Sequence, residues 1–329
     1  MASAQETPKP VSPVPTATVT PKPTPRPRPK MSWERAFERL HSRLKADGLK
    51  GRALAPFNVA KLKYVERAVE AKMLNVIRPM APFGDYADEK SVHKGREFLK
   101  DHEAAFNLAQ KESDVAPSIM AAILWIETRY GVYKPRFFEL SVLASLAALS
   151  DGEFGKEVAA KIAEKAKSEE PKAAALDWTN RAFEIGSAWY EELKSFLLVC
   201  EIRGWNARKI KGSWAGAVGY GQFMPKTALR NMTQGPTVWL ADLWSWDDTI
   251  RLVARHLKEN GWSPAAAVGA KKEAILKYNR HTGYADAVFA LATQLEQPPR
   301  TPTPTIGDTY QLKITNEINL INHQNSVGL

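Results

Sequence analysis

The sequence predicts a mainly α-helical protein with little β structure, and two observations support this prediction. In several segments apolar residues recur every three or four positions, the spacing that places them on one face of a helix. Several of these segments also carry a helix start or stop signal at the expected end. By contrast, the alternation of apolar and polar residues that is typical of a half-buried strand is suggestive only at 310–321.

The first expected helices lie in the N-terminal half of the chain. One begins at about Ser32, a residue type suited to the N-cap position, and its apolar residues repeat at helical spacing. Helices are expected next at 101–111 and 117–130. The second of these has Pro117 in its first turn, where proline is tolerated, and Gly131 just past its end.

Further helices are expected in the C-terminal half. An apolar stripe at 189–200 indicates one helix, with polar residues on its other side. Residues 245–248 have the form of a capping box that opens a helix at 246–259, and Asn260-Gly261 closes that helix. The last expected helices are 274–278 and 284–295.

Proline-rich segments flank the helical part at both ends. Residues 1–30 contain nine prolines and several basic residues, so we expect a disordered basic linker that cannot bury a core. A second proline-rich spacer begins at 297 and leads into a C-terminal segment. We therefore predict a linker at 1–30, one folded domain at 31–296, and a spacer with a C-terminal segment at 297–329.

Composition and charge exclude several classes of protein. The chain has 329 residues, of which 44% are hydrophobic, and no apolar run approaches the ~18 residues of a membrane-spanning helix. The single cysteine, Cys200, excludes an internal disulfide and a four-cysteine metal cluster. The net charge of +10 would suit an anionic partner such as nucleic acid, anionic lipid or a cell-wall polymer, but charge alone favours an ordinary solvated surface.

Several common catalytic and nucleotide-binding motifs are absent. The six histidines are scattered singly, so no set of metal ligands emerges. The glycine-rich segment 215–221 lacks the Lys-Ser/Thr ending of a phosphate-binding loop, and no Gly-x-Ser-x-Gly motif occurs. We therefore expect neither a metal site nor a cofactor.

Glu127 is the candidate catalytic residue, because it continues the apolar face of a helix. Ile123 and Leu124 precede it at helical spacing. A carboxylate is rarely buried unless it is paired or functional, and burial would raise its pKa so that it could protonate a leaving-group oxygen. The structural alternative is a salt bridge to Arg129 or a nearby lysine, although a residue two positions away points elsewhere on a helix.

A second cluster, 211–225, has the composition of a saccharide-binding segment. Its glycines allow a ligand to approach the backbone, and Ser213 and Gln222 offer hydrogen bonds. Its aromatic side chains, which could equally belong to the core, offer flat faces that suit sugar rings: Trp214, Tyr220 and Phe223. A third cluster, 277–284, places an amide between two tyrosines, and its structural alternative is a simple helix–loop–helix junction.

The three clusters occur in the order and with the spacing of a known family. Ile-Glu-Thr-Arg-Tyr-Gly around Glu127, then Gly-Ser-Trp-Ala-Gly-Ala-Val-Gly-Tyr-Gly-Gln-Phe-Met-Pro, then Tyr-Asn before a tyrosine resemble the lytic transglycosylases of the membrane-bound B type, glycoside hydrolase family 103. The resemblance covers 115–295. It implies a lysozyme-like transglycosylase fold and a catalytic domain at 31–296, with a helical insertion around 132–205.

The resemblance also implies an activity and a set of site residues. The activity is cleavage of the β-1,4 bond between N-acetylmuramic acid and N-acetylglucosamine in peptidoglycan, with a 1,6-anhydromuramoyl product. Glu127 would act as general acid and then as base. The family often has a calcium loop after the central motif, but 231–240 contains no Asp or Glu, so we predict no calcium there. The implied substrate-binding residues are Ser213, Tyr220, Gln222, Phe223, Tyr278, Asn279 and Tyr284.

Partners and location follow from the same resemblance. It implies peptidoglycan glycan strands as the partner and the bacterial cell envelope, in the periplasm, as the location, although the chain contains no signal sequence. Cell-wall or envelope proteins could bind the proline-rich tails, and nucleic acid is not expected because no base-reading motif accompanies the basic residues. Two alternatives stay open: a muramidase-type hydrolase that uses water in the same cleft, and a non-catalytic peptidoglycan-binding protein.

Overall fold

The computed structural model describes residues 30–78, 84–233 and 239–298. The chain divides into two units, Met1–Met31 and Ser32–Leu329, and the account below concerns the second. The predicted linker, apart from Lys30, and the predicted strand at 310–321 lie outside the described residues. No helix in the described part of the chain is long and apolar enough to span a membrane.

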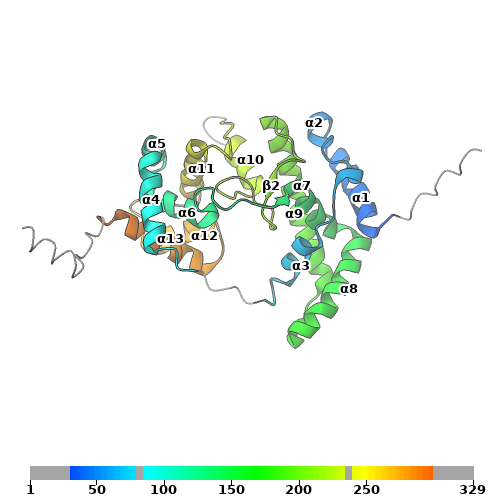
Figure 1. Ribbon diagram of the computed structural model, residues 1–329. Helices are drawn as coiled ribbons and strands as arrows, with labels where there is room; N and C mark the ends of the chain where they lie inside the picture. Colours follow the sequence, from blue (N-terminus) through cyan, green and yellow to red (C-terminus); the bar gives the residue numbers. More distant parts are fainter. Residues whose placement is uncertain (1–29, 79–83, 234–238, 299–329) are drawn as a thin grey trace, which may run out of the picture. The chain divides into compact units, whose positions relative to one another are not determined.

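The described residues are mainly α-helical, as the sequence predicts (Figure 1). Two strands, β1 (Phe137–Phe138) and β2 (Lys211–Gly212), pair antiparallel with Phe137 opposite Gly212. Short 3-10 turns are η1 (Val59–Lys61), η2 (Ala148–Ser150) and η3 (Pro171–Ala175). The α-helices are α1 (Ser32–Ala46), α2 (Gly51–Leu54), α3 (Glu66–Leu74), α4 (Glu89–Asp101), α5 (Glu103–Ser113), α6 (Pro117–Thr128), α7 (Glu139–Ala147), α8 (Gly152–Glu169), α9 (Trp178–Arg203), α10 (Pro225–Thr233), α11 (Trp246–Glu259), α12 (Val268–Leu276) and α13 (Thr282–Glu296).

The helices pack as two groups, and each group contains helices from separate parts of the chain. In one group α6 contacts α4, α11 and α13, and α5 contacts α11. In the other, α7 and α8 pack on α9, and α1 and α3 pack on α7 (Figure 1). Helix α10 contacts both α9 and α11, so it joins the two groups. The central glycine-rich motif lies just before α10, between β2 and α10.

The predicted helix ends agree with the structure where local signals are strong. Helix α11 spans the predicted 246–259, and the Ser245 hydroxyl accepts a hydrogen bond from the Asp248 N–H at its start. Helix α6 is shorter than the predicted 117–130, because Arg129 and Tyr130 have left-handed φ values of 49° and 52°. The expected helices at 101–111 and 274–278 are displaced, and the structure has α5 and α12 there.

Several elements were not individually predicted, among them α4, α8, the first half of α9 and the two strands. The buried residues of α4 are Ser91, Val92, Gly95 and Phe98, a face too polar and too small to give a clear apolar period. Helix α8 and the first half of α9 were left unassigned for a similar reason, since charged residues interrupt their apolar stripes. The strands β1 and β2 are two residues long, too short for alternation to be visible.

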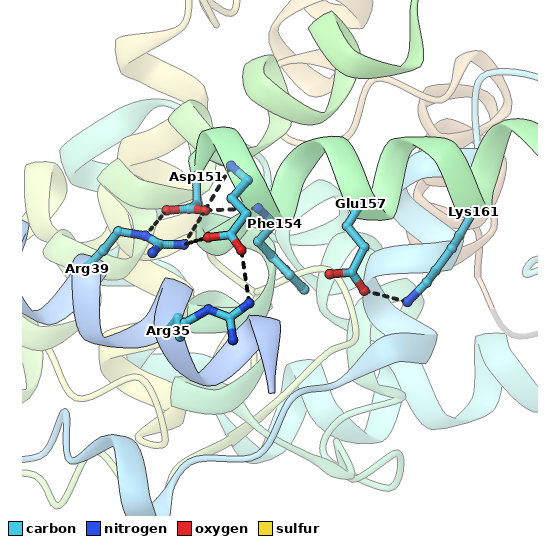
Figure 2. Close-up of polar contacts among 7 residues, drawn as sticks. Arg35, Arg39, Asp151, Phe154, Glu157 and Lys161 are labelled. Carbon is cyan, nitrogen blue, oxygen red and sulfur yellow. Dashed lines mark hydrogen bonds and ion pairs between the residues drawn. The ribbon is translucent and has the colours of Figure 1, made fainter. Parts of the chain in front are cut away.

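Helix α1 is attached to the start of α8 by a group of ion pairs (Figure 2). The Arg39 guanidinium forms two hydrogen bonds with the Asp151 carboxylate, and Arg35 Nη2 lies 2.9 Å from Glu153 Oε1. The Asp151 carboxylate also caps α8, accepting hydrogen bonds from the Glu153 and Phe154 N–H groups. Because one carboxylate serves both contacts, the start of α8 is held against α1.

Candidate active site

The end of α6 is fastened directly to the central motif. The Thr128 hydroxyl donates to the Tyr220 carbonyl oxygen at 3.0 Å and accepts from the Gly131 N–H at 3.2 Å. The Tyr133 N–H donates to the Thr128 carbonyl at 2.9 Å. Glu127, one residue earlier, is therefore held by both the helix and the loop that follows it.

Glu127 is partly buried, and its carboxylate accepts a hydrogen bond from a tyrosine of α13. Tyr284 Oη donates to Glu127 Oε1 at 2.7 Å. Burial raises the pKa of Glu127 to about 7, although the Tyr284 hydrogen bond acts in the opposite direction. Among the described residues no cation pairs with Glu127, and Arg129 is exposed at the left-handed end of the helix, so the salt-bridge alternative is wrong for this pair.

Tyr278 connects the third cluster to the central motif. Its ring stacks on Tyr284, with centroids 6.3 Å apart, and its hydroxyl donates a hydrogen bond to the Gly221 carbonyl. Behind it lie the rings of Phe223 and His256, at 5.3 and 5.1 Å. His256 is buried and close to Arg230, which lowers its pKa to about 4 and leaves a neutral ring.

The central motif folds as tight turns joined by two isolated β-bridges, Gly212 with Val218 and Val218 with Phe223. The Ser213 hydroxyl accepts hydrogen bonds from the Ala215 and Ala217 N–H groups at 3.2 and 3.0 Å. Gly219 has φ 78°, and a Cβ there would lie 2.6 Å from the Leu243 backbone oxygen, so only glycine fits. Gln222 also has a positive φ of 49°, and its side-chain amide donates to the Gly219 carbonyl at 2.8 Å. This strained backbone lies beside Tyr278.

The aromatic faces predicted to meet a sugar are mostly covered by protein. Phe223 is 3% exposed and Tyr284 is 0% exposed, so neither ring presents a free face. Tyr220 stacks on Trp246 with centroids 4.0 Å apart. Trp214 is the exception, being 40% exposed at the tip of the turn. Phe223, one of the predicted flat faces, is therefore covered by protein in this structure, and the substrate-binding roles expected of Phe223 and Tyr284 stay predictions.

The structure thus brings the three sequence clusters together. Glu127 and Tyr284 are in contact, Tyr278 joins Tyr284 to Gly221, and Thr128 joins α6 to Tyr220. Asn279 is turned to its own loop, where its side-chain oxygen accepts from the His281 N–H at 3.1 Å. Ser213 and Gln222 remain partly accessible.

Sequence reasoning missed several residues that shape this region. Trp246 covers Tyr220, and the Trp189 indole N–H donates to the Ala215 carbonyl at 3.1 Å. Both tryptophans lie in helices that the sequence predicts from their apolar stripes. An apolar stripe does not indicate which residues of another helix or loop it will contact. Glu139 had a readable signal, since it is a carboxylate in an apolar segment like Glu127.

No group of three or more His, Cys, Asp or Glu side chains that could hold a metal ion occurs within the described ranges. Residues 231–240, for which no calcium is predicted, are described only in part, because 234–238 lie outside those ranges. The absence of calcium there stays a prediction.

Known proteins resemble this chain in sequence and in fold. The membrane-bound lytic murein transglycosylase B of Escherichia coli K12 is 28% identical over 172 residues, 52% of this chain and 39% of that relative's length. The lytic transglycosylase SLT35 of E. coli, solved in complex with bulgecin A, has a TM-score of 0.58 at 19% identity, over 79% of this chain and 92% of that one. SltB3 of Pseudomonas aeruginosa, solved with NAG-NAM-pentapeptide, has a TM-score of 0.60 at 18% identity, over 84% of each chain.

The structural likenesses show a shared fold, the lysozyme-like fold of these transglycosylases. The family assignment comes from the sequence, because the profile of the transglycosylase SLT domain matches residues 32–273, well over half of the chain. The match includes Glu127 and the central motif at 211–225, and it ends before the third cluster at 277–284. This chain belongs to the transglycosylase SLT domain family.

Proposed function

We propose that this protein is a lytic transglycosylase that cleaves the β-1,4 bond between N-acetylmuramic acid and N-acetylglucosamine in peptidoglycan. The observation that carries the proposal is the Glu127 carboxyl, whose pKa of about 7 lets it hold a proton at neutral pH and release it during the reaction. Family membership and the curated relative, a murein transglycosylase, support the same substrate.

In the first step, protonated Glu127 donates its proton to the glycosidic oxygen. The bond from that oxygen to the muramoyl anomeric carbon breaks, and N-acetylglucosamine leaves with a new hydroxyl. The positive charge that develops on the anomeric carbon is supported by the oxygen of the muramoyl N-acetyl group, which replaces the second carboxylate of ordinary glycosidases. Tyr284 stabilises the Glu127 carboxylate as it forms, through their 2.7 Å hydrogen bond.

In the second step, the Glu127 carboxylate removes the proton from the C6 hydroxyl of the same muramoyl residue. The C6 oxygen then bonds to the anomeric carbon and closes a 1,6-anhydro ring, and Glu127 is protonated again. No water is consumed, because the attacking hydroxyl belongs to the substrate and gains the advantage of proximity.

The remaining site residues differ in how far their side chains are exposed to a bound glycan. Ser213, Gln222 and Asn279 keep polar side chains at a partly accessible surface, so we propose that they bind the glycan. The Tyr278 hydroxyl donates to the Gly221 carbonyl, and we propose that Tyr278 orients the glycan strand there. Three further residues complete the proposed substrate-binding set, although their rings are largely covered by neighbouring side chains: Tyr220, Phe223 and Tyr284.

The same proposal extends to the whole chain. Residues 31–296 form the catalytic domain, with 1–30 and 297–329 as proline-rich tails that could bind cell-wall or envelope proteins. Peptidoglycan strands are the partner, and the bacterial periplasm is the location. The curated relative is named as membrane-bound and acts on murein, which supports the cell envelope for this chain too.

Mass spectrometry of digested peptidoglycan tests the proposal. The wild-type protein should release fragments that end in 1,6-anhydromuramic acid, and Glu127→Gln should release almost none. Reducing-end products from the wild type would instead identify a hydrolase. Binding without any cleavage would identify a non-catalytic wall-binding protein. Unchanged clearing by Glu127→Gln would show that another residue is the acid.

A further inference from the structure

Lys72 is a half-buried cation that the proposed reaction does not use. It lies in the last turn of α3, and its ammonium nitrogen is 4.1 Å from the centroid of the Trp189 ring. Burial and, to a smaller extent, the charges of the Arg181 and Arg280 guanidinium groups together lower the pKa of Lys72 to about 8. Three positive charges are thus gathered at one place, with one of them partly removed from water.

The acidic groups around Lys72 are paired with other cations. Glu70, two residues earlier on α3, forms ion pairs with Lys165 and Arg78, and Arg78 also pairs with Glu169. Within the described residues neither Lys72 nor Arg280 has a carboxylate partner. A partly desolvated lysine without a counter-charge is unfavourable, and an external anion would relieve the repulsion.

Arg181, unlike Lys72 and Arg280, uses its guanidinium to bind backbone carbonyl oxygens. It holds the end of α3 through hydrogen bonds to the Lys72 and Met73 carbonyl oxygens. Arg181 therefore fixes the backbone that presents Lys72, while Lys72 and Arg280 keep their donors available.

The position of this charge is beside the candidate active site. The Trp189 ring under Lys72 donates its indole N–H to Ala215, in the turn that begins at Ser213. Arg280 directly follows Tyr278 and Asn279. Lys72 is therefore connected to the central motif through Trp189, and Arg280 belongs to the third cluster.

We propose that Lys72, together with Arg280, binds a carboxylate carried on the lactyl side of a muramoyl residue. This inference rests on the proposed function. The sugar rings of the glycan are neutral, so the anionic groups that a cation can bind on the strand are carboxylates. One source is the lactyl acid itself where the peptide has been removed, and the other is the first free carboxylate of an attached stem peptide.

The test compares three ligands with wild type and Lys72→Met, in which the methionine keeps an unbranched side chain over Trp189. The ligands are peptide-bearing strands, strands stripped of peptide by an amidase, and neutral chito-oligosaccharides. Lys72→Met should raise KM about tenfold on the carboxylate-bearing strands with little change in kcat, since the lost contact is made before and during the reaction. Affinity for chito-oligosaccharides should not change, and Lys72→Arg should keep a low KM.

Comparing the peptide-bearing strands with the stripped strands identifies the source of the carboxylate. The strand type with the larger rise in KM carries the carboxylate that Lys72 binds. Lys45→Met is the matched control, because Lys45 is exposed in the last turn of α1. An equal rise for the control, or an equal loss of chito-oligosaccharide affinity, would overturn the inference. If the wild type makes no anhydro product from any strand, the proposed function fails instead.

Discussion

Glu127 and Glu139 are two buried glutamates in apolar helices, and their surroundings differ in an instructive way. Glu127 lies at the C-terminal end of α6, is partly accessible, and accepts a hydrogen bond from Tyr284. Glu139 is the first residue of α7, is 0% exposed, and neither of its carboxyl oxygens has a hydrogen-bond partner in the described structure. Burial raises the pKa of both.

The comparison shows that burial raises the pKa of a carboxyl without giving it access to the surface. Glu139 lies under β2, where a Cβ on Gly212 would be 1.8 Å from its Oε2, and the charge of Glu192 raises its pKa further. Its burial without a hydrogen-bond partner favours the protonated form and closes it off from the surface. Glu127 differs by having access to the surface and a tyrosine that stabilises its ionised form, and both are needed for a group that gives and takes a proton.

The largest expected effect is on activity at Glu127. Glu127→Gln should lower the cleavage rate by about 10²- to 10⁴-fold, the usual contribution of a general acid–base group, while the melting temperature stays the same or rises. Glu139→Gln should keep most of its activity, because its carboxyl does not reach the substrate. Equal losses for the two variants would remove the distinction between them.

The second expected effect is on the stability of the fold, at Gly212, which packs against the Glu139 carboxyl. Gly212→Ala should destabilise the fold by about 1–3 kcal/mol, because its Cβ would overlap Glu139 Oε2 and approach the Ala217 carbonyl within 2.6 Å. Urea unfolding measures this, with Gly152→Ala as the control, since nothing lies within 4 Å of a Cβ at Gly152. A Gly212→Ala protein as stable as the control would mean that Glu139 is not packed under β2.

Glu139→Gln should show a stability gain that depends on pH. The raised pKa means that folded Glu139 keeps a proton that the unfolded chain loses above about pH 4.5. Wild-type stability should therefore fall relative to Glu139→Gln by up to about 1.4 kcal/mol per pH unit from there towards the folded pKa. Denaturant unfolding at several pH values measures the difference, and a constant difference between pH 4 and pH 8 would contradict it.

Tyr284→Phe should have the smallest effect of the four. Losing the Tyr284 hydroxyl removes the hydrogen bond that favours ionised Glu127, so the pKa of Glu127 should rise and the pH–rate profile should move to higher pH. The rate at the optimum should fall by about tenfold, the value of one hydrogen bond to a charged group. An unshifted profile would mean that Tyr284 does not set the proton affinity of Glu127.

Some of this arrangement was predictable from local sequence. The apolar run that ends in Glu127, with Pro117 at its start, predicts the helix and the unusual carboxylate. The capping box predicts where α11 begins. Helix α4 and the strands β1 and β2 were not predictable, because a small polar face and two-residue strands leave no readable period.

The sequence by itself determined the helical class, the position of Glu127 in an apolar helix and the three clusters, because each is a property of neighbours along the chain. Only the tertiary structure decided that Tyr284 reaches Glu127, that Trp246 covers the Tyr220 ring and that Lys72 lies over Trp189. These contacts join residues on different helices, and the packing of those helices fixes them. A pattern along the chain records which face of a helix is apolar, and it does not record which residue that face will meet.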